Sequence, residues 1–346
     1  MTDFGKIFSD LLIRWHETAA RDLPWRGEKD PYKIWISEIM LQQTRTETVK
    51  SYYANFLNAF GDVFQLADAP EEEVLKLWEG LGYYSRARNL HAAAKKVAYE
   101  LGGVFPDRFE TLKTLPGVGD YAAGAIASIA FGKVEPALDG NQARVLTRVL
   151  NIDRVIKSPA VLYERALELV DENDPGEYNQ ALMGLGAMVC TPKNPKCESC
   201  PVRSVCASYR IGNQHELPRK PEKLKRRIET RGVALVINDE GSVYVRKRES
   251  GMLVGLWEFP GYTDARSMAD VCACLEEEGI LCTPLCEIGK HKHIFTHLEW
   301  HMTGYLLKAV RAPEGAVFAD REMIDALAMP TALVRYREYF RNREIK

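Results

Sequence analysis

The stretch Leu115–Tyr121, "LPGVGDY", holds two glycines around a valine and is followed by the run "AAGAIASIA". Glycine allows a sharp turn, and the small residues predict a closely packed helix that begins near Asp120. The first backbone N–H groups of a helix have no partner within it, so such a helix start can bind a phosphate. We therefore predict a helical hairpin in which Gly117 and Gly119 contact an anionic ligand. An ordinary turn between two helices remains the alternative for this stretch alone.

Helical patterns continue on both sides of the hairpin, from the N-terminus to about Tyr209. Apolar residues recur at intervals of three and four, and the breaks carry helix start signals. Asp30 and Pro31 are typical of the cap and first position of one helix. Glu71–Glu73 place acidic groups in the first turn of another. We therefore predict an all-α domain over residues 1–210.

The pattern changes after Ile211. A polar, basic and proline-bearing segment predicts a linker over residues 211–230. Beyond it, "RGVALVI" and "SVYVRKRE" flank the turn "NDEG" and predict a hairpin, while "HKHIFTHLEWHMTGYLL" also alternates. The segments "SMADVCACLEEEG" and "PTALVRYREYF" predict helices. A smaller α+β domain is therefore expected over residues 231–346.

Composition is compatible with a globular protein that binds an anionic partner. The chain has 346 residues, of which 46% are hydrophobic, enough for two or three domains with buried cores. Its net charge of −2 hides a basic segment, Pro218–Arg231, with seven Lys and Arg against two Glu. No charged segment and apolar run follow Met1, and no apolar stretch reaches membrane-spanning length. We expect a soluble, cytoplasmic protein without a membrane partner.

Four of the eight cysteines fall within 17 residues, "CTPKNPKCESCPVRSVC". Their spacing, C-x6-C-x2-C-x5-C, contains one close pair, whereas a zinc site usually shows two. Three prolines keep the loop irregular, and four thiolates in such a loop can hold a 4Fe-4S cluster. A zinc knuckle is the alternative. The predicted ligands are Cys190, Cys197, Cys200 and Cys206. The other four, Cys272, Cys274, Cys282 and Cys286, are predicted to be core thiols.

Two carboxylates lie in contrasting environments. Asp139, in "PALDGNQARVL", directly precedes a predicted helix, whose dipole and N–H groups hold a carboxylate ionised. Glu38, in "WISEIM", lies among apolar residues, and burial would raise its pKa. One group that stays anionic and one that delivers a proton is the pair that glycosidic bond cleavage requires. A plain helix cap and a glutamate paired with arginine are the simpler alternatives.

These residues resemble a known family. The hairpin, the distant Asp and the cysteine loop are similar to the helix-hairpin-helix DNA glycosylase superfamily, to which endonuclease III belongs. Within it, four motifs resemble adenine DNA glycosylases of the MutY type: "DLPWR" (Asp22–Arg26), "WISEIMLQQT" (Trp35–Thr44), "WEGLGYYSRARNL" (Trp78–Leu90) and "LDGN" (Leu138–Asn141). The resemblance runs from about Phe8 to Cys206. It implies an all-α glycosylase fold with a 4Fe-4S cluster in the loop 190–206.

The resemblance also implies a reaction. Its substrate would be double-stranded DNA in which adenine is mispaired with 8-oxoguanine or guanine, and the adenine would be flipped out and removed by water. Glu38 would protonate the purine and Asp139 would stabilise the sugar cation, supported by Asn141 and Tyr121. In bifunctional relatives a lysine occupies the place of Tyr121 and forms a Schiff base, which a phenol cannot form. Activity limited to base removal is therefore expected.

Further residues are assigned by their places in the motifs. Arg26 and Leu41 would line the adenine pocket, Gln43 and Tyr83 would fill the gap left by the base, and Arg86 and Arg88 would contact phosphates. A surface ion pair and a core leucine are the alternatives for the two pocket residues.

The C-terminal part resembles a Nudix domain. "LWEFPG" and "EEEG" are similar to the two ends of the Nudix signature, but Cys272 and Ala273 stand where its metal-binding Arg-Glu pair belongs. A diphosphate hydrolase is therefore not expected. The resemblance implies recognition of 8-oxoguanine on the opposite strand, read by "FTH", which is Phe295, Thr296 and His297. His291, His293, His297 and His301 are predicted to share one face of a strand that contacts DNA, with a zinc site as the alternative.

Two other functions remain open from the sequence. A thymine or uracil mismatch glycosylase of the same superfamily would share the hairpin and the cluster, but Glu38 and the C-terminal domain argue against it. A non-catalytic DNA-binding module would leave the pair Glu38 and Asp139 without a purpose. We expect a monomer associated with the nucleoid.

Overall fold

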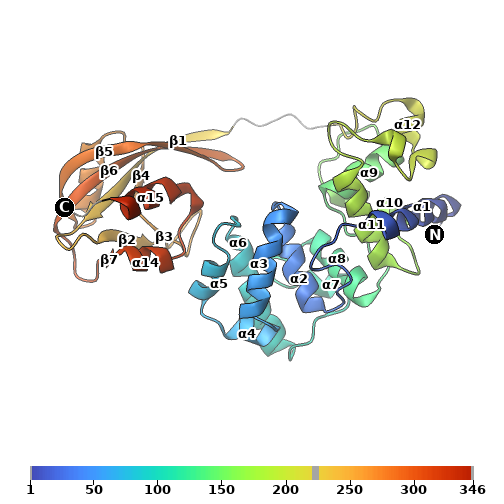
Figure 1. Ribbon diagram of the computed structural model, residues 1–346, viewed down its shortest axis with the longest axis horizontal. Coiled ribbons are helices and arrows are strands. Elements are labelled where there is room, and N and C mark those ends of the chain that lie inside the picture. The colour runs from blue at the N-terminus through green and yellow to red at the C-terminus, as the bar shows by residue number, and fades with distance from the viewer. Residues whose placement is uncertain (1, 220–225, 344–346) are drawn as a thin grey trace. The chain divides into compact units, whose positions relative to one another are not determined.

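The computed structural model describes residues 2–219 and 226–343, which form two compact units (Figure 1). The first comprises Met1–Ala69 and Arg88–Glu222, and the second comprises Pro70–Ala87 and Lys223–Lys346. The predicted domain limits, 1–210, 211–230 and 231–346, follow chain order and stay predictions. Residues 220–225 of the predicted linker lie outside the described residues.

The first unit is helical, as the sequence predicts, and the residues described in it contain no strand longer than an isolated bridge. Its helices are α1 (Asp3–Ala19), α2 (Pro31–Leu41), α3 (Thr46–Ala59), α4 (Val63–Asp68), α6 (Ser85–Lys95, which begins in the second unit), η1 (Lys96–Glu100), α7 (Phe109–Leu112), α8 (Asp120–Phe131), α9 (Gly140–Val149), η2 (Pro159–Leu162), α10 (Tyr163–Leu167), α11 (Pro175–Met188), η3 (Cys197–Ser199), η4 (Arg203–Val205) and α12 (Ala207–Ile211).

The predicted helix starts are confirmed. Asp30 caps α2 by accepting a hydrogen bond from the Tyr32 backbone N–H at 2.9 Å. The helix α8 begins at Asp120, after a turn in which Gly117 has a φ of +76°. A Cβ atom at Gly117 would lie 2.7 Å from Cβ of Asn89, so both the backbone angle and the close packing require glycine there.

The small residues of α8 allow the chain that leads to Asp139 to pack against it. A Cβ atom at Gly124 would lie only 2.1 Å from the carbonyl oxygen of Pro136. The buried Asn179 of α11 then fixes this segment, because its Oδ1 accepts from the Ala137 N–H at 3.0 Å and its Nδ2 donates to the Glu135 carbonyl at 2.8 Å. These contacts hold the segment that leads into α9 against both α8 and α11.

The second unit is built on a mixed seven-stranded sheet in the order β3-β2-β1-β6-β5, with β4 paired to β1 and β7 to β2. Among the strands that the structure describes, β1 and β6 pair in parallel and the other pairs are antiparallel. The strands are β1 (Arg227–Ile237), β2 (Val243–Lys247), β3 (Trp257–Glu258), β4 (Gly261–Thr263), β5 (Leu281–Ile294), β6 (Leu298–Arg311) and β7 (Val317–Ala319). The predicted hairpin around "NDEG" is confirmed, since Ile237 pairs with Val243.

Helices cover both faces of this sheet. Val233, Leu235 and Ile237 of β1 pack in one core with residues of α14 (Arg321–Ala326), η5 (Thr331–Leu333) and α15 (Val334–Asn342). The alternate residues, Ala234 and Val236, pack in a second core with α13 (Met268–Glu277). The α+β class predicted for this region is therefore confirmed. Strand β1 begins at Arg227, inside the predicted linker, because its first residues pair with β6 far along the chain.

The prediction that four histidines share one strand face is wrong. His291 and His293 lie on β5 and Lys292 between them pairs with His301 of β6. Residues that pair directly share a face, so His301 lies on the face opposite to His291 and His293. Among the described residues, no three His, Cys, Asp or Glu side chains are grouped closely enough to hold a metal ion.

Residues 70–87 precede α7 in the chain but pack in the second unit. They contain α5 (Glu71–Leu77), as the acidic run predicts, and the loop that leads into α6. Within residues 2–219 and 226–343, no helix is long and apolar enough to cross a membrane.

Candidate active site

Glu38 lies in α2 among side chains that form the core, and only 5% of its surface is exposed. The hydroxyl of Tyr121 donates a hydrogen bond to its Oε2. Burial raises the pKa of Glu38 to about 7; the Tyr121 hydrogen bond opposes this shift and the charge of Asp139 adds to it. A large share of Glu38 is therefore protonated at neutral pH, as a proton donor requires.

Tyr121 stands in the first turn of α8, directly after the glycine turn. Burial raises the pKa of its hydroxyl well above the ordinary value, so the group remains a hydrogen-bond donor. The hydroxyl contacts Glu38 and lies 3.7 Å from Sδ of Met183. Tyr121 was predicted to support Glu38 and Asp139, and its direct hydrogen-bond partner in the structure is Glu38.

Asp139 is the N-cap of α9. Its Oδ1 accepts from the Gln142 backbone N–H at 2.7 Å and its Oδ2 accepts from Nδ2 of Asn141 at 2.9 Å. Asn141 is held in turn by Arg144, whose Nη2 donates to its Oδ1 at 3.0 Å. The structure thus provides a buried carboxyl group whose pKa is raised to about 7, and a second carboxyl group that accepts from a backbone and an amide donor.

The predicted cluster ligands line one cavity. Cys190, Cys197, Cys200 and Cys206 surround it together with apolar residues of α9 and α11, among them Val145, Val149 and Leu185. All four are free thiols. Four thiolates that line one cavity can hold an iron-sulfur cluster.

Two buried arginines of α9 hold the cysteine loop. Arg148, 1% exposed, donates to the carbonyls of Thr191 at 2.8 Å and Pro192 at 3.1 Å and lies 3.3 Å from Sγ of Cys190. One turn earlier, Arg144 donates to the Cys190 carbonyl at 2.9 Å. We did not single out these arginines from the sequence. The signal for them was two cations four residues apart on a helix whose neighbours are apolar.

The loop after α5 has an unusual backbone. Gly80, Gly82 and Tyr83 have φ values of +100°, +71° and +48°, and the side chain of Tyr83 is 47% exposed. Arg86 is buried and donates to the carbonyls of Leu81 at 3.0 Å and Gly82 at 3.1 Å. Arg86 therefore holds this loop from within, and its predicted phosphate contact stays a prediction.

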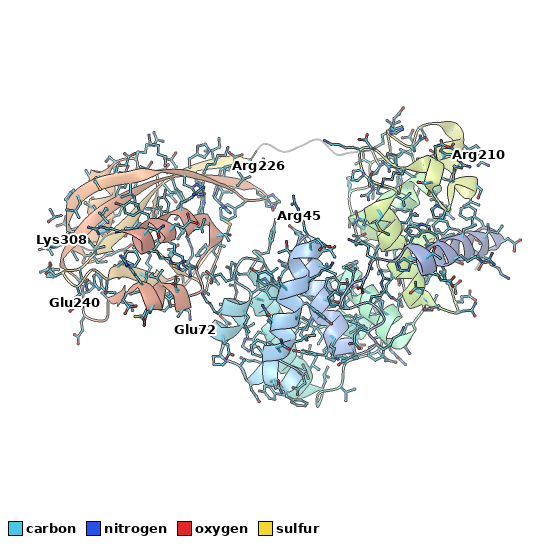
Figure 2. All side chains as sticks on the ribbon, viewed as in Figure 1. Arg45, Glu72, Arg210, Arg226, Glu240 and Lys308 are labelled. Atoms are coloured by element: carbon cyan, nitrogen blue, oxygen red, sulfur yellow. The ribbon has the colours of Figure 1, made fainter. Side chains whose placement is uncertain are left out.

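Gln43 shares the rare left-handed backbone of Tyr83, with a φ of +56°, and is exposed. Strained backbone at two residues that were predicted to enter the DNA is typical of functional sites. Nearby, the exposed Arg45 extends from the start of α3 (Figure 2). The predicted pocket residues are half-buried: Leu41 ends α2, and Nη1 of Arg26 donates to Oε1 of Gln180 at 3.1 Å. Arg88 is also half-buried.

The residues predicted to read the opposite base form the turn between β5 and β6. Phe295 packs its ring against Trp300 at a centroid distance of 4.8 Å, while Thr296 and His297 are exposed at the tip. Oγ1 of Thr296 lies 3.1 Å from the hydroxyl of Tyr83 within the same unit. A predicted wedge residue and a predicted reading residue are thus in contact.

Comparisons with known proteins agree with this arrangement. The model of the HhH-GPD superfamily of base excision DNA repair proteins matches residues 36–172, the iron-sulfur binding domain of endonuclease III matches residues 190–206, and the NUDIX domain matches residues 232–339. The solved structure of a thermostable thymine-DNA glycosylase has a TM-score of 0.56 at 32% identity, covering 60% of this chain and 97% of that one. An endonuclease III–DNA complex shares the fold, with a TM-score of 0.52 at 21% identity, covering 61% of this chain and 99% of that chain. Fold and site thus define a base excision DNA repair protein of the HhH-GPD superfamily with an iron-sulfur loop.

Sequence relatives narrow the class. The adenine DNA glycosylase of Mus musculus is 37% identical over 97% of this chain and 78% of its own length. That of Buchnera aphidicola subsp. Baizongia pistaciae is 34% identical over 84% of this chain and 83% of its own length. The chain belongs to the adenine DNA glycosylase family.

Proposed function

We propose that this chain hydrolyses the glycosidic bond of adenine mispaired with 8-oxoguanine or guanine in double-stranded DNA and leaves an abasic site. The observation that carries the proposal is the buried Glu38, whose pKa is raised to about 7, together with the N-cap Asp139, which interacts electrostatically with it. A departing purine needs a proton and the sugar left behind carries positive charge. These two carboxyl groups supply both needs at neutral pH.

Each step falls to residues of the first unit. Glu38 protonates the extruded adenine, and Tyr121 keeps the carboxyl group oriented through its hydrogen bond. Asp139 faces the developing sugar cation. Asn141 donates a hydrogen bond to its carboxylate and so limits the rotation of that group. The turn at Gly117 and Gly119 presents the first N–H groups of α8 to a DNA phosphate, which positions the duplex without reading its sequence. Water completes the hydrolysis.

Tyr121 restricts the reaction to base removal. A lyase that also cuts the strand uses an amine to form an imine with the sugar, and a phenol cannot form that bond. The four cysteines would hold the iron-sulfur group. Its role would be structural, because thiolates would fill all of its protein ligand positions. We assign the reading of the opposite base to Thr296, whose hydroxyl can donate to or accept from a base edge.

The test is base excision by Glu38→Gln in single turnover. The variant should still bind the mispaired duplex but lose at least about 100-fold in rate, because the proton donor is gone while the phosphate contacts remain. Glu47→Gln, at an exposed side chain of α3, is the matched control and should behave as the unchanged protein. Near-normal excision by Glu38→Gln would refute the assigned role.

Parallel duplexes separate the rival functions. Faster release of thymine from a T:G pair than of adenine from an A:8-oxoguanine pair would identify a thymine glycosylase, the activity named for the solved structure at 32% identity. Tight binding to the lesion duplex without release of any base would identify a DNA-binding module.

A further inference from the structure

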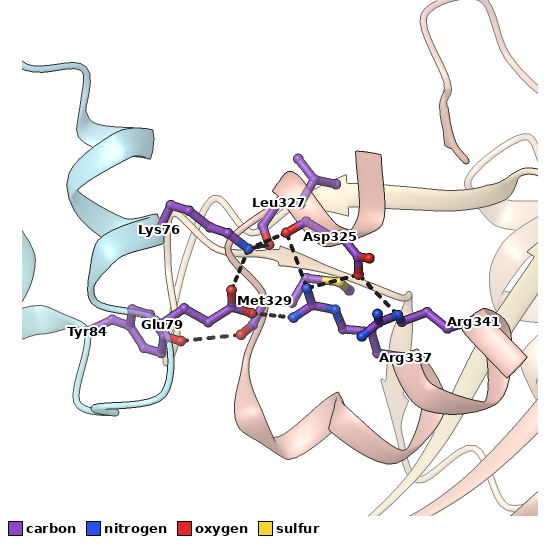
Figure 3. Close-up of polar contacts among 8 residues, drawn as sticks. All are labelled: Lys76, Glu79, Tyr84, Asp325, Leu327, Met329, Arg337 and Arg341. Carbon is purple, nitrogen blue, oxygen red and sulfur yellow. Dashed lines mark hydrogen bonds and ion pairs between the residues drawn. The ribbon is translucent and has the colours of Figure 1, made fainter. Parts of the chain in front are cut away.

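Residues 70–87 fall within the stretch 36–172 that matches the glycosylase family model, yet they pack in the second unit. The loop Gly80–Tyr84, which presents Tyr83, lies between two polar anchors to the C-terminal fold. Both anchors join residues that belong to the second unit (Figure 3).

The first anchor is centred on Glu79, directly before the loop. Its Oε2 accepts from Nζ of Lys76 at 2.6 Å and its Oε1 accepts from Nη1 of Arg337 in α15 (Figure 3). The same two cations converge on Asp325 of α14: Lys76 donates to its carbonyl oxygen, and Nη2 of Arg337 lies 3.4 Å from that oxygen and 3.5 Å from Oδ1. We call Lys76, Glu79, Asp325 and Arg337 the clasp.

Burial distinguishes the clasp from an ordinary surface ion pair. The side chains of Glu79 and Arg337 are only 19% and 17% exposed. An exposed ion pair adds little to stability, whereas loss of one partner from a shielded, charge-assisted network leaves the remaining charges with fewer partners. Because Glu79 binds two cations and Arg337 binds both Glu79 and Asp325, removal of Glu79 or Arg337 breaks contacts to two other members of the clasp.

The second anchor is Tyr84, the last residue of the loop. The buried Tyr84 donates from its hydroxyl to the Met329 carbonyl at 3.3 Å (Figure 3). Between the anchors the loop is fixed internally, because Nε1 of Trp78 donates to the Gly82 carbonyl at 3.1 Å and Arg86 donates to the same oxygen. A loop tied at both ends and braced inside keeps its position relative to the C-terminal fold.

We propose that the clasp is a positioning device through which the C-terminal fold sets the place of the Gly80–Tyr84 loop, and thereby the discrimination of the base opposite the adenine. The proposal rests on the function proposed above. Tyr83 contacts Thr296 at the tip of the β5–β6 turn, so a shift of the loop changes the relation between the wedge and the reading residue. The clasp residues themselves act through Tyr83 and touch no substrate.

The experiment compares full-length Glu79→Gln, Arg337→Gln, the double variant and Arg337→Lys. Arg335→Gln is the matched control, since Arg335 lies on the same helix with its side chain 69% exposed. Amide hydrogen exchange over residues 78–84 reports the loop directly, without DNA. Single-turnover excision from A:8-oxoguanine and A:G duplexes gives the preference as a ratio of rates.

Both single glutamine variants should exchange faster in the loop and lose about three- to tenfold of the preference. The double variant should lose no more than either single one, because all three break one network, and Arg337→Lys should retain most of the preference. Unchanged exchange in Glu79→Gln and Arg337→Gln would overturn the proposal whatever the enzyme cleaves. Faster exchange with an unchanged preference would overturn the link to discrimination, while a Thr296→Ala variant that loses preference would show that the proposed function itself holds.

Discussion

At the scale of single residues, Glu38 shows how a core position acquires the properties of a proton donor. The same apolar neighbours that make α2 a buried helix remove water from the carboxyl group and favour its neutral form. Tyr121 limits this effect by donating to the carboxylate, and Asp139 adds to it by charge. The pKa of Glu38 therefore depends on burial, on Tyr121 and on Asp139, and the pH dependence of the excision rate tests this balance.

The excision rate should fall as the pH rises through the pKa of Glu38, about 7, because only the protonated carboxyl group donates. Tyr121→Phe removes a hydrogen bond that lowers this pKa, so the alkaline limb of the kcat/KM profile should move to higher pH. Single-turnover rates between pH 5 and 9 measure both effects. A limb that stays in place in Tyr121→Phe would mean that the tyrosine does not tune Glu38.

Glu38 should also reduce stability at alkaline pH. Its pKa is about 7 in the folded protein against 4.5 for an unperturbed glutamate, so the folded state binds the proton more tightly. The stabilisation is fully present below pH 4.5 and is lost as the pH rises to about 7, by about 3 kcal/mol.

Glu38→Gln cannot ionise and should gain stability relative to the unchanged protein between pH 5 and 8. Chemical denaturation at pH 5 and at pH 8 measures the gain in stability, with Glu47→Gln as the exposed control. An equal difference in stability at the two pH values would show that the pKa of Glu38 is not raised.

At the scale of elements, α9 joins Asp139, the carboxylate proposed to face the sugar, to the cysteine loop. Asp139 caps its start, and Arg144 and Arg148 on its buried side donate to the loop that holds the four cysteines. Because α9 is short, a displacement of the cysteine loop would be transmitted over a small distance to Asp139. We expect the cluster and the active site to depend on each other through this helix.

Arg148→Met should lower the iron content below the four atoms per chain expected for a cubane and destabilise the fold by about 3 kcal/mol or more. The buried carbonyls of Thr191 and Pro192 would lose their donor, and methionine fills the volume without replacing it. Iron analysis of anaerobically purified protein and thermal denaturation measure the outcome. Arg165→Gln, at an exposed arginine of α10 paired with Glu168, is the control. Full iron loading of Arg148→Met would show that the loop needs no such donor.

Local signals predicted most elements, and long-range contacts explain what the sequence could not predict. Asp30 and Asp139 marked helix starts because a cap bonds to N–H groups two or three residues away. Asn179 and Arg144 could not be recognised in this way, because each acts on a segment about 40 residues distant. The start of β1 was read as linker for the same reason, since Arg227 pairs with Leu298.

At the scale of the whole molecule, the division into two units does not follow the order of residues along the chain. The residues assigned to bond cleavage, Glu38, Tyr121 and Asp139, lie in the first unit, whereas Tyr83 and Thr296 lie in the second. The sequence motif Trp78–Leu90 gave no indication of this division, because its packing partners are residues 325–337, which a local pattern cannot reveal. Chemistry and recognition of the opposite base are thus assigned to different units.

Removal of residues 212–346 should therefore separate the two activities. A chain that ends at Ile211 keeps the bond-cleaving residues, and the solved thymine-DNA glycosylase, matched over 97% of its length by 60% of this chain, shows that such a fold exists by itself. Its Gly80–Tyr84 loop loses the partners of Glu79 and Tyr84. Excision from A:G should persist within about tenfold, while the preference for A:8-oxoguanine should largely disappear, because both Thr296 and the positioned Tyr83 are lost. Full-length Thr296→Ala, which keeps the loop anchored, should lose only part of the preference. A truncated chain that discriminates the two duplexes as well as the full chain would show that recognition lies entirely within residues 1–211.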